Sequence, residues 1–300
     1  MKIIQMKNIY FLLFATIIFT ACVPEQQAIE INPYKIDKGD APWIIAHGGS
    51  KDLFPENTMV AFQGSAAIGV DALEMDVTMT KDEVLITHHD LTIDRTSNGT
   101  GPVIDYTYDE LLQFNFAHTF KDINDNNPYA NDTISPAKLE DIFTTFPNYQ
   151  LMVELKDRGE DGKRAAELLK AMIEQYELEK RIVVVAFSDD VLSYFYEITD
   201  GQILIGTSEE ATKDFVFTGL SAMEFLYRPE ASVVAIPTEN SGINLASKQV
   251  IKSAHRRNMA VHYWTINDKE TMKALIELGA DGLITDRPDL MKEVLEELGF

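Results

Sequence analysis

The chain has 300 residues, of which 45% are hydrophobic and 25% charged, the composition of an ordinary globular protein. A single cysteine excludes an intramolecular disulfide framework and any metal site built from several thiolates of one chain. The formal net charge of −22 repels phosphate backbones from most of the surface, so the composition argues against nucleic-acid binding.

The N-terminus has the pattern of an export signal. Lys2 and Lys7 precede an apolar run over residues 9–19, which is well short of the ~20 residues that span a bilayer. Small residues then precede Cys22, which resembles a bacterial lipoprotein cleavage site. We therefore expect residues 1–21 to be a signal peptide and Cys22 to carry the lipid. The alternative is a core cysteine that follows an ordinary signal.

A lipidated Cys22 predicts a protein held by its acyl chains on the outer side of a bacterial cytoplasmic membrane, or in the periplasm or outer membrane. Residues 22–42 contain prolines, glutamines and charges without a sustained period, so we expect them to form a tether. The folded domain is then expected to occupy residues 43–300.

From Trp43 onward, short apolar runs alternate with amphipathic stretches, which is typical of a parallel sheet with crossover helices. The remaining length is close to the ~250 residues of a (β/α)₈ TIM barrel, the α/β fold that we predict. The eight expected strands are Trp43–Ala46, Ala72–Val77, Leu151–Leu155, Ile182–Phe187, Ile203–Ile205, Val233–Ile236, Ala260–Trp264 and Gly282–Ile284.

A further apolar run, Val84–Thr87, lies too close to the second strand for a crossover helix between them. We expect the second strand to pass the barrel rim, turn near residues 81–83 and return as an antiparallel hairpin. A turn centred between the second and third of these residues would place Asp76 opposite His89.

The region of residues 98–148 is the least regular part of the chain. It contains two candidate helices, Tyr108–Phe114 and Leu139–Thr145, separated by a polar loop. We expect it to be an insertion that covers the rim of the barrel.

Three carboxylates on two predicted strands form a candidate metal site. Glu74 and Asp76 alternate along one strand and so project to the same face, where they repel unless a cation joins them. Glu154, on another strand, supplies a third carboxylate, and a set of oxygen ligands suits Ca²⁺ or Mg²⁺ better than zinc. Lys156 faces the same way and would attract a phosphate. The alternatives are a solvated acidic face and a local ion pair of Lys156 with Glu154.

Two histidines are candidates for acid–base chemistry. His47 ends the first strand, and His89 ends the hairpin. Two histidines across a phosphodiester can withdraw one proton and donate another, because imidazole titrates near neutral pH. Each histidine alone is more often structural. Of the others, His262 is the strongest further candidate, because it shares a strand face with Trp264.

Eight short motifs occur in a fixed order along residues 43–288 and resemble the glycerophosphodiester phosphodiesterase family. They are His47–Gly49 with Pro55–Thr58, Leu73–Val77, Thr80–Asp82, His89–Thr96, Asn98–Gly99, Val153–Lys156, Trp264–Asn267 and Asp281–Pro288.

The resemblance implies a TIM barrel that hydrolyses glycerophosphodiesters to sn-glycerol 3-phosphate and an alcohol. It also implies roles for seven side chains: one divalent cation, Ca²⁺ or Mg²⁺, on Glu74, Asp76 and Glu154, acid–base catalysis by His47 and His89, a phosphate contact by Lys156, and a wall of the substrate pocket formed by Trp264.

The chain departs from the family pattern at two positions. Gly48 stands where the family usually has an arginine that binds phosphate. Either Lys156 and the cation carry this function, or Lys51 or Arg95 reaches in, or activity is reduced. Ala186 stands where the family commonly has a serine, which removes one hydroxyl near the rim.

Other functions remain open for the same barrel. It could act as a lysophospholipase D or as a hydrolase of polyglycerolphosphate of the teichoic type, or it could be a binding lipoprotein without catalysis. In the enzymatic mechanism, the nucleophile is either water or the glycerol 2-hydroxyl, and the second of these gives a cyclic phosphate first.

Overall fold

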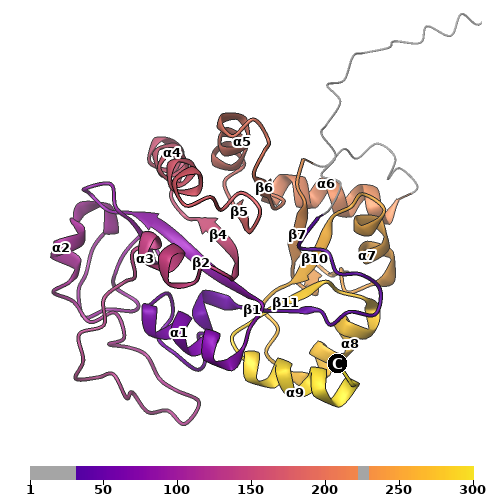
Figure 1. Ribbon diagram of the computed structural model, residues 1–300, viewed down its shortest axis with the longest axis horizontal. Coiled ribbons are helices and arrows are strands. Elements are labelled where there is room, and N and C mark those ends of the chain that lie inside the picture. Colours follow the sequence, from indigo (N-terminus) through magenta and orange to yellow (C-terminus); the bar gives the residue numbers. More distant parts are fainter. Residues whose placement is uncertain (1–31, 222–229) are drawn as a thin grey trace, which may run out of the picture. The chain divides into compact units, whose positions relative to one another are not determined.

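Eight parallel strands close into a barrel in the part of the chain that the computed structural model describes, residues 32–221 and 230–300 (Figure 1). They are β1 (Trp43–Ala46), β2 (Ala72–Met79), β4 (Gln150–Leu155), β5 (Ile182–Ala186), β6 (Leu204–Ile205), β7 (Val233–Ile236), β10 (Ala260–Tyr263) and β11 (Gly282–Thr285). Neighbours follow the order β6-β5-β4-β2-β1-β11-β10-β7, and a parallel bridge between Gly206 and Val233 joins the two ends. The predicted barrel is confirmed.

Helices connect the strands and cover the outside of the barrel (Figure 1). They are α1 (Met59–Ile68), α4 (Gly159–Gln175), α5 (Asp189–Ile198), α6 (Glu209–Leu220), α7 (Lys248–His255), α8 (Lys269–Leu278) and α9 (Pro288–Leu298). In α4, Ala165, Leu169 and Ile173 recur at four-residue spacing and are all buried, as an amphipathic helix requires. Among the described residues, we find no helix with the length and apolar character needed to cross a bilayer.

Strand β2 shows how the barrel separates its core from its mouth. Leu73, Met75 and Val77 belong to the hydrophobic core shared with the helices. Glu74 and Asp76 take the opposite face and line a cavity. This alternation is the one expected from the period of two along a strand.

The predicted hairpin forms between β2 and β3 (Leu85–Thr87), but its register differs from the prediction by one residue. The observed pairs place His88, and not His89, opposite Asp76, and the backbone N–H of His88 donates to the carbonyl of Asp76 over 2.9 Å. Strand β3 ends at Thr87, and beyond it His88 packs edge-on against Phe116 while His89 lines the cavity, so His89 reaches the cavity although the register differs from the prediction.

The length of the turn explains the shift. Thr80 N–H donates to the carbonyl of Val84, which leaves a loop of three residues, 81–83. Its last residue, Glu83, has a φ of 61°, as in the left-handed position that closes hairpins of this length. A loop with an odd number of residues places the centre of the hairpin on Asp82, whereas the prediction placed the centre between Asp82 and Glu83.

The insertion after the hairpin has a small core of its own, formed by Ile86, Ile93, Val103, Leu111 and Phe116. It includes α2 (Tyr108–Leu111), which is shorter than predicted, and the short 3₁₀ turn η2 (Val103–Asp105). The helix α3 (Leu139–Thr145) has the predicted bounds.

A second hairpin, which the sequence analysis missed, follows β7. It consists of β8 (Glu239–Asn240) and β9 (Ile243–Asn244). Ser241 and Gly242 between them both have positive φ, 52° and 78°, as a two-residue type I′ turn requires. The strands are too short and too exposed to give an alternating hydrophobic pattern.

Residues 32–42 pack against the barrel, so the predicted tether is too long at its C-terminal end. Tyr34 is fully buried and donates from its hydroxyl to the carbonyl of Leu151, at the start of β4, over 2.8 Å. Asn32 donates to the carbonyls of Ser232 and Asn258. The segment therefore closes the end of the barrel at which the strands begin. The predicted signal peptide and Cys22 lie outside the described residues.

Candidate active site

The three predicted carboxylates meet where β2 and β4 approach the mouth of the barrel. Asp76 and Glu154 are direct partners in the parallel register of these strands. Glu74, Asp76 and Glu154 each offer an oxygen atom, and these atoms all lie within 4.8 Å of one another. Oxygens that bind one Ca²⁺ at 2.3–2.6 Å can be about 5 Å apart at most, so the cluster has the donor type and spacing for a hard divalent cation.

The three carboxylates of the cluster repel one another unless positive charge is added. Burial raises the pKa of Glu74 and of Glu154, and the charge of Asp76 adds to the effect. Burial also opposes the charge of Asp76, but Lys51 and Lys156 outweigh it and hold the pKa of Asp76 well below its usual range. The carboxylates therefore compete for cations, which is the behaviour expected of a site built to hold one.

Lys156 and Asn57 fix Asp76 from two sides. The Lys156 ammonium lies 2.8 Å from Asp76 Oδ1 and 2.6 Å from Glu154 Oε1, so the ion pair considered in the sequence analysis does form. Asn57 Nδ2 donates to Asp76 Oδ2 over 2.8 Å, and Asp76 N–H donates back to Asn57 Oδ1. Thr58 caps α1, whereas Asn57 acts on the cluster instead.

His47 lies between a carboxylate and an ammonium. Its Nδ1 is 2.7 Å from Asp286 Oδ1, and Asn267 Nδ2 donates to the other oxygen of Asp286. Lys51 Nζ lies 3.0 Å from His47 Nε2. An ammonium can only donate, so Nε2 accepts and the ring proton is assigned to Nδ1, which donates to Asp286. Burial lowers the pKa of His47, but Asp286 and Glu74 outweigh burial and leave the pKa above its usual value.

His89 follows the hairpin and lines the same cavity as His47. Its Nδ1 lies 2.7 Å from Asp90 Oδ1, and Arg95 donates to the other oxygen of Asp90. Burial would raise the pKa of Asp90, but Arg95 and His89 lower it to about 2. Arg95 also makes two hydrogen bonds to Glu56, so it is engaged outside the acidic cluster.

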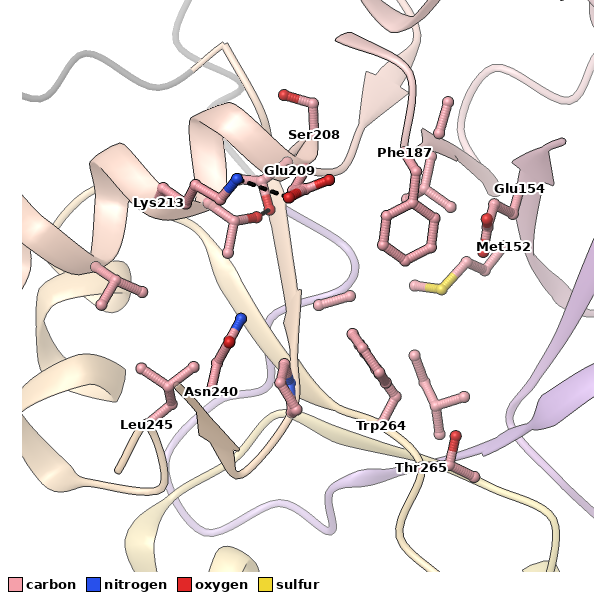
Figure 2. Close-up of a pocket in the computed structure, with 18 of the residues that line it drawn as sticks. Met152, Glu154, Phe187, Ser208, Glu209, Lys213, Asn240, Leu245, Trp264 and Thr265 are labelled. Atoms are coloured by element: carbon pink, nitrogen blue, oxygen red, sulfur yellow. Dashed lines mark hydrogen bonds and ion pairs between the residues drawn. The ribbon is translucent and has the colours of Figure 1, made fainter. Parts of the chain in front are cut away.

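A cavity of about 1000 Å³ opens from the acidic cluster. Figure 2 shows Phe187 and Trp264 between Glu154 on one side and Leu245 on the other. Beyond these rings, the wall is mostly apolar and comes from α6 and the β8–β9 hairpin; it includes Val216, Phe217, Leu220, Ile243 and Leu245. Phe217 and Phe187 are 65% and 51% exposed, a large apolar surface at an open mouth.

All seven predicted site residues lie around this cavity, and the cluster needs several more that the sequence analysis did not assign. The unassigned side chains are Asn57, Asp90, Asn267 and Asp286, and Lys51 was considered only as one replacement for the missing arginine. All but Lys51 fall within the motifs quoted above, so their positions were visible, but only the fold shows which neighbour each one contacts. His262 is fully buried against Tyr34 and Trp43, away from the cluster.

Comparison with known proteins gives a matching family and relatives that span most of the chain. The model of the glycerophosphoryl diester phosphodiesterase family matches residues 47–290. A glycerophosphodiester phosphodiesterase of Bacillus altitudinis is 28% identical over 262 residues, covering 85% of this chain and 98% of the relative. A lysophospholipase D of Rattus norvegicus is 26% identical over 283 residues, covering 85% of this chain and 86% of the relative.

Solved structures show the same fold at low sequence identity. A glycerophosphoryl diester phosphodiesterase domain from Mycobacterium tuberculosis has a TM-score of 0.74 and 18% identity, covering 86% of this chain and 100% of that chain. A phosphodiesterase of Oleispira antarctica in complex with the product sn-glycerol-3-phosphate has a TM-score of 0.70 and 19% identity, covering 85% of this chain and 97% of that chain.

Proposed function

The chain belongs to the glycerophosphoryl diester phosphodiesterase family, and from this premise we propose that it hydrolyses glycerophosphodiesters to sn-glycerol 3-phosphate and an alcohol. The observation that carries the proposal is the meeting of Glu74, Asp76 and Glu154 in a cavity that His47 and His89 also line. The curated relative that bears this activity in its name supports it.

The acidic cluster would hold one divalent cation, either Ca²⁺ or Mg²⁺. The donors are carboxylate oxygens alone, and their spacing fits one hard ion. When bound, such a cation offsets the negative charge of the phosphate during hydrolysis.

The two histidines exchange protons with the substrate. One withdraws a proton from the nucleophile, either water or the glycerol 2-hydroxyl, and the other donates a proton to the departing alkoxide as its bond to phosphorus breaks. Asp286 and Asp90 orient the two rings through their Nδ1 atoms. Lys156 contributes positive charge beside the carboxylates, and Trp264 forms a wall of the substrate pocket.

The test is a coupled assay of sn-glycerol 3-phosphate release with Ca²⁺, Mg²⁺ or a chelator. We expect Glu74→Gln and Glu154→Gln to abolish cation-dependent turnover, with a folded barrel by circular dichroism. Glu160→Gln is the matched control, because that side chain is 93% exposed and pairs with Lys163 on its own helix. Unchanged activity in both cluster variants would reject the site.

The apolar wall favours a second candidate, a lysophospholipase D activity on the same barrel. Phe217, Leu220 and Ile243 would suit an acyl chain, whereas a polyglycerolphosphate offers them no apolar partner. A panel of glycerophosphocholine, lysophosphatidylcholine and polyglycerolphosphate separates these substrates by their kcat/KM. Stoichiometric binding without turnover would instead support a binding lipoprotein.

We further propose that the protein is exported and anchored by a lipid on Cys22, on the outer side of the cytoplasmic membrane or in the periplasm or outer membrane. The basic and apolar N-terminal pattern supports this. Wild-type protein should sediment with membranes, and Cys22→Ser should appear in the soluble fraction. An unchanged distribution would contradict the anchor.

A further inference from the structure

The side chain of Lys51 passes directly over Gly48. A Cβ atom built on Gly48 would lie 2.3 Å from Lys51 Cε, closer than carbon atoms approach, and 3.3 Å from Lys51 Nζ. Gly48 also has a φ of 51°, in the left-handed region. Any side chain at position 48 would therefore displace the end of Lys51 from its observed path.

This path brings the Lys51 ammonium into the candidate site. Nζ lies 3.0 Å from His47 Nε2 and 3.4 Å from Asp76 Oδ2, and the side chain is 15% exposed. An ammonium has three N–H donors, and these two contacts use two of them. The charge is thus held beside the imidazole and the carboxylate that the proposed hydrolysis needs.

The balance of charge at the site calls for this second lysine. Three carboxylates and a phosphodiester together carry four negative charges, whereas one divalent cation and Lys156 carry three positive charges. Arg95 is engaged with Asp90 and Glu56 and does not supply the fourth. Lys51 adds positive charge directly beside the cluster.

We propose that Lys51 is a phosphate-binding residue of this site and that glycine at position 48 is what admits it. The proposal rests on the proposed function. It makes residues 48 and 51 a coupled pair, because a side chain at position 48 would move Lys51 away from His47 and Asp76.

The first test compares Lys51→Met with wild type. We expect the KM for glycerophosphocholine, and the dissociation constant of sn-glycerol 3-phosphate measured by titration calorimetry, to rise about 10- to 100-fold, as for a lost charged hydrogen bond. Lys51→Arg should retain part of the affinity. Lys121→Met, which removes a largely exposed lysine, is the matched control and should leave both values unchanged.

The second test is a double-mutant cycle with Gly48→Ala. Backbone strain at position 48 is the same in both backgrounds, but the collision disappears in Lys51→Ala, which lacks the Cγ and Cε atoms that a Cβ at position 48 would meet. Gly48→Ala should therefore weaken product binding in the wild-type background and have little further effect in Lys51→Ala. Gly48→Arg combined with Lys51→Ala should recover part of the lost affinity.

Unchanged product affinity in Lys51→Met would overturn the proposal. If Lys51→Met also bound Ca²⁺ or Mg²⁺ more tightly, Lys51 would be only a counter-charge for the carboxylates. If wild type shows no turnover but binds inorganic phosphate, and Lys51→Met loses that binding, the proposed function fails and the role of Lys51 stands.

Discussion

Three charged groups of the site act on His47. Asp286 and Glu74 raise its pKa, whereas burial and Lys51 lower it. The hydrogen bond from Nδ1 to Asp286 also decides which ring nitrogen faces the cluster. Asp286 is therefore a positioning residue, and its effect can be separated from that of the ring itself.

Replacing Asp286 with asparagine should lower kcat and shift the pH profile. Without the carboxylate, the pKa of His47 falls, so the limb of the profile that depends on His47 moves to lower pH, whether this histidine acts as acid or base. We expect kcat to fall roughly 10²- to 10⁴-fold, within the usual range for acid–base catalysis. Profiles of kcat/KM from pH 5 to 9 measure the shift, and a limb that stays in place would contradict the assignment.

His262 illustrates a buried histidine without a catalytic role. Its Nε2 lies 3.2 Å from the carbonyl of Tyr34, and its buried Nδ1 has no hydrogen-bond partner among the described residues. Burial lowers its pKa below the usual 6.5, so the folded state keeps it neutral.

The stability of the protein should therefore fall as the pH drops below about 6.5. In that range the unfolded chain protonates His262 and the folded chain does not, so the unfolded state binds more protons. His262→Phe should reduce the slope of the unfolding free energy against pH by up to about 1.4 kcal/mol per pH unit. Urea unfolding at pH 5 to 7 measures this slope, and an identical slope in the variant would refute the prediction.

For single residues, the sequence indicated which residue types form the site, but it indicated less well which side chains they contact. Alternation along β2 and the charge of Glu154 were enough to predict the acidic cluster. The contacts of Asn57 and Asp286 depend on distances across the barrel, which no local pattern encodes. The predicted hairpin register was wrong for a simpler reason. Composition does not distinguish a loop of three residues from one of two or four, and a difference of one residue in the loop shifts the strand pairing by one residue.

Among the elements, the barrel strands were the most predictable. Each is a short apolar run bounded by turn residues, and its bounds agree with the structure to within two residues. The segment of residues 32–42 was missed because it has no regular structure and anchors itself through a few side chains. Tyr34 and Asn32 reach carbonyls more than a hundred residues away, which composition cannot indicate.

Tyr34 should contribute strongly to the stability of the barrel. Tyr34→Ala removes a fully buried aromatic ring and should cost about 3–5 kcal/mol of unfolding free energy. Tyr34→Phe keeps the ring but loses the hydrogen bond to Leu151, and should cost about 1 kcal/mol. Urea unfolding measures both, and a wild-type stability for Tyr34→Ala would show that the segment is dispensable.

The net charge of the whole molecule opposes the approach of its substrate. At −22, the surface repels an anionic diester at long range, and Lys51 and Lys156 act only once it has arrived. Raising the ionic strength from 0.01 M to 0.15 M shortens the Debye length from about 30 Å to about 8 Å.

We therefore expect kcat/KM for an anionic diester, such as glycerophosphoglycerol, to rise several-fold over this range. Zwitterionic glycerophosphocholine, which has no net charge, should change less and serves as the control. A decrease with salt for the anionic substrate would mean that the lysines at the mouth, and not the whole surface, govern the encounter.

The attachment of residues 32–42 also has a topographical consequence. The chain enters at the end of the barrel opposite the carboxylates, and only nine residues separate Asn32 from Cys22, a reach of at most about 35 Å. With a lipid at Cys22, the closed base of the barrel would lie within this reach of the membrane. Such an enzyme would meet its substrates close to the surface that holds it.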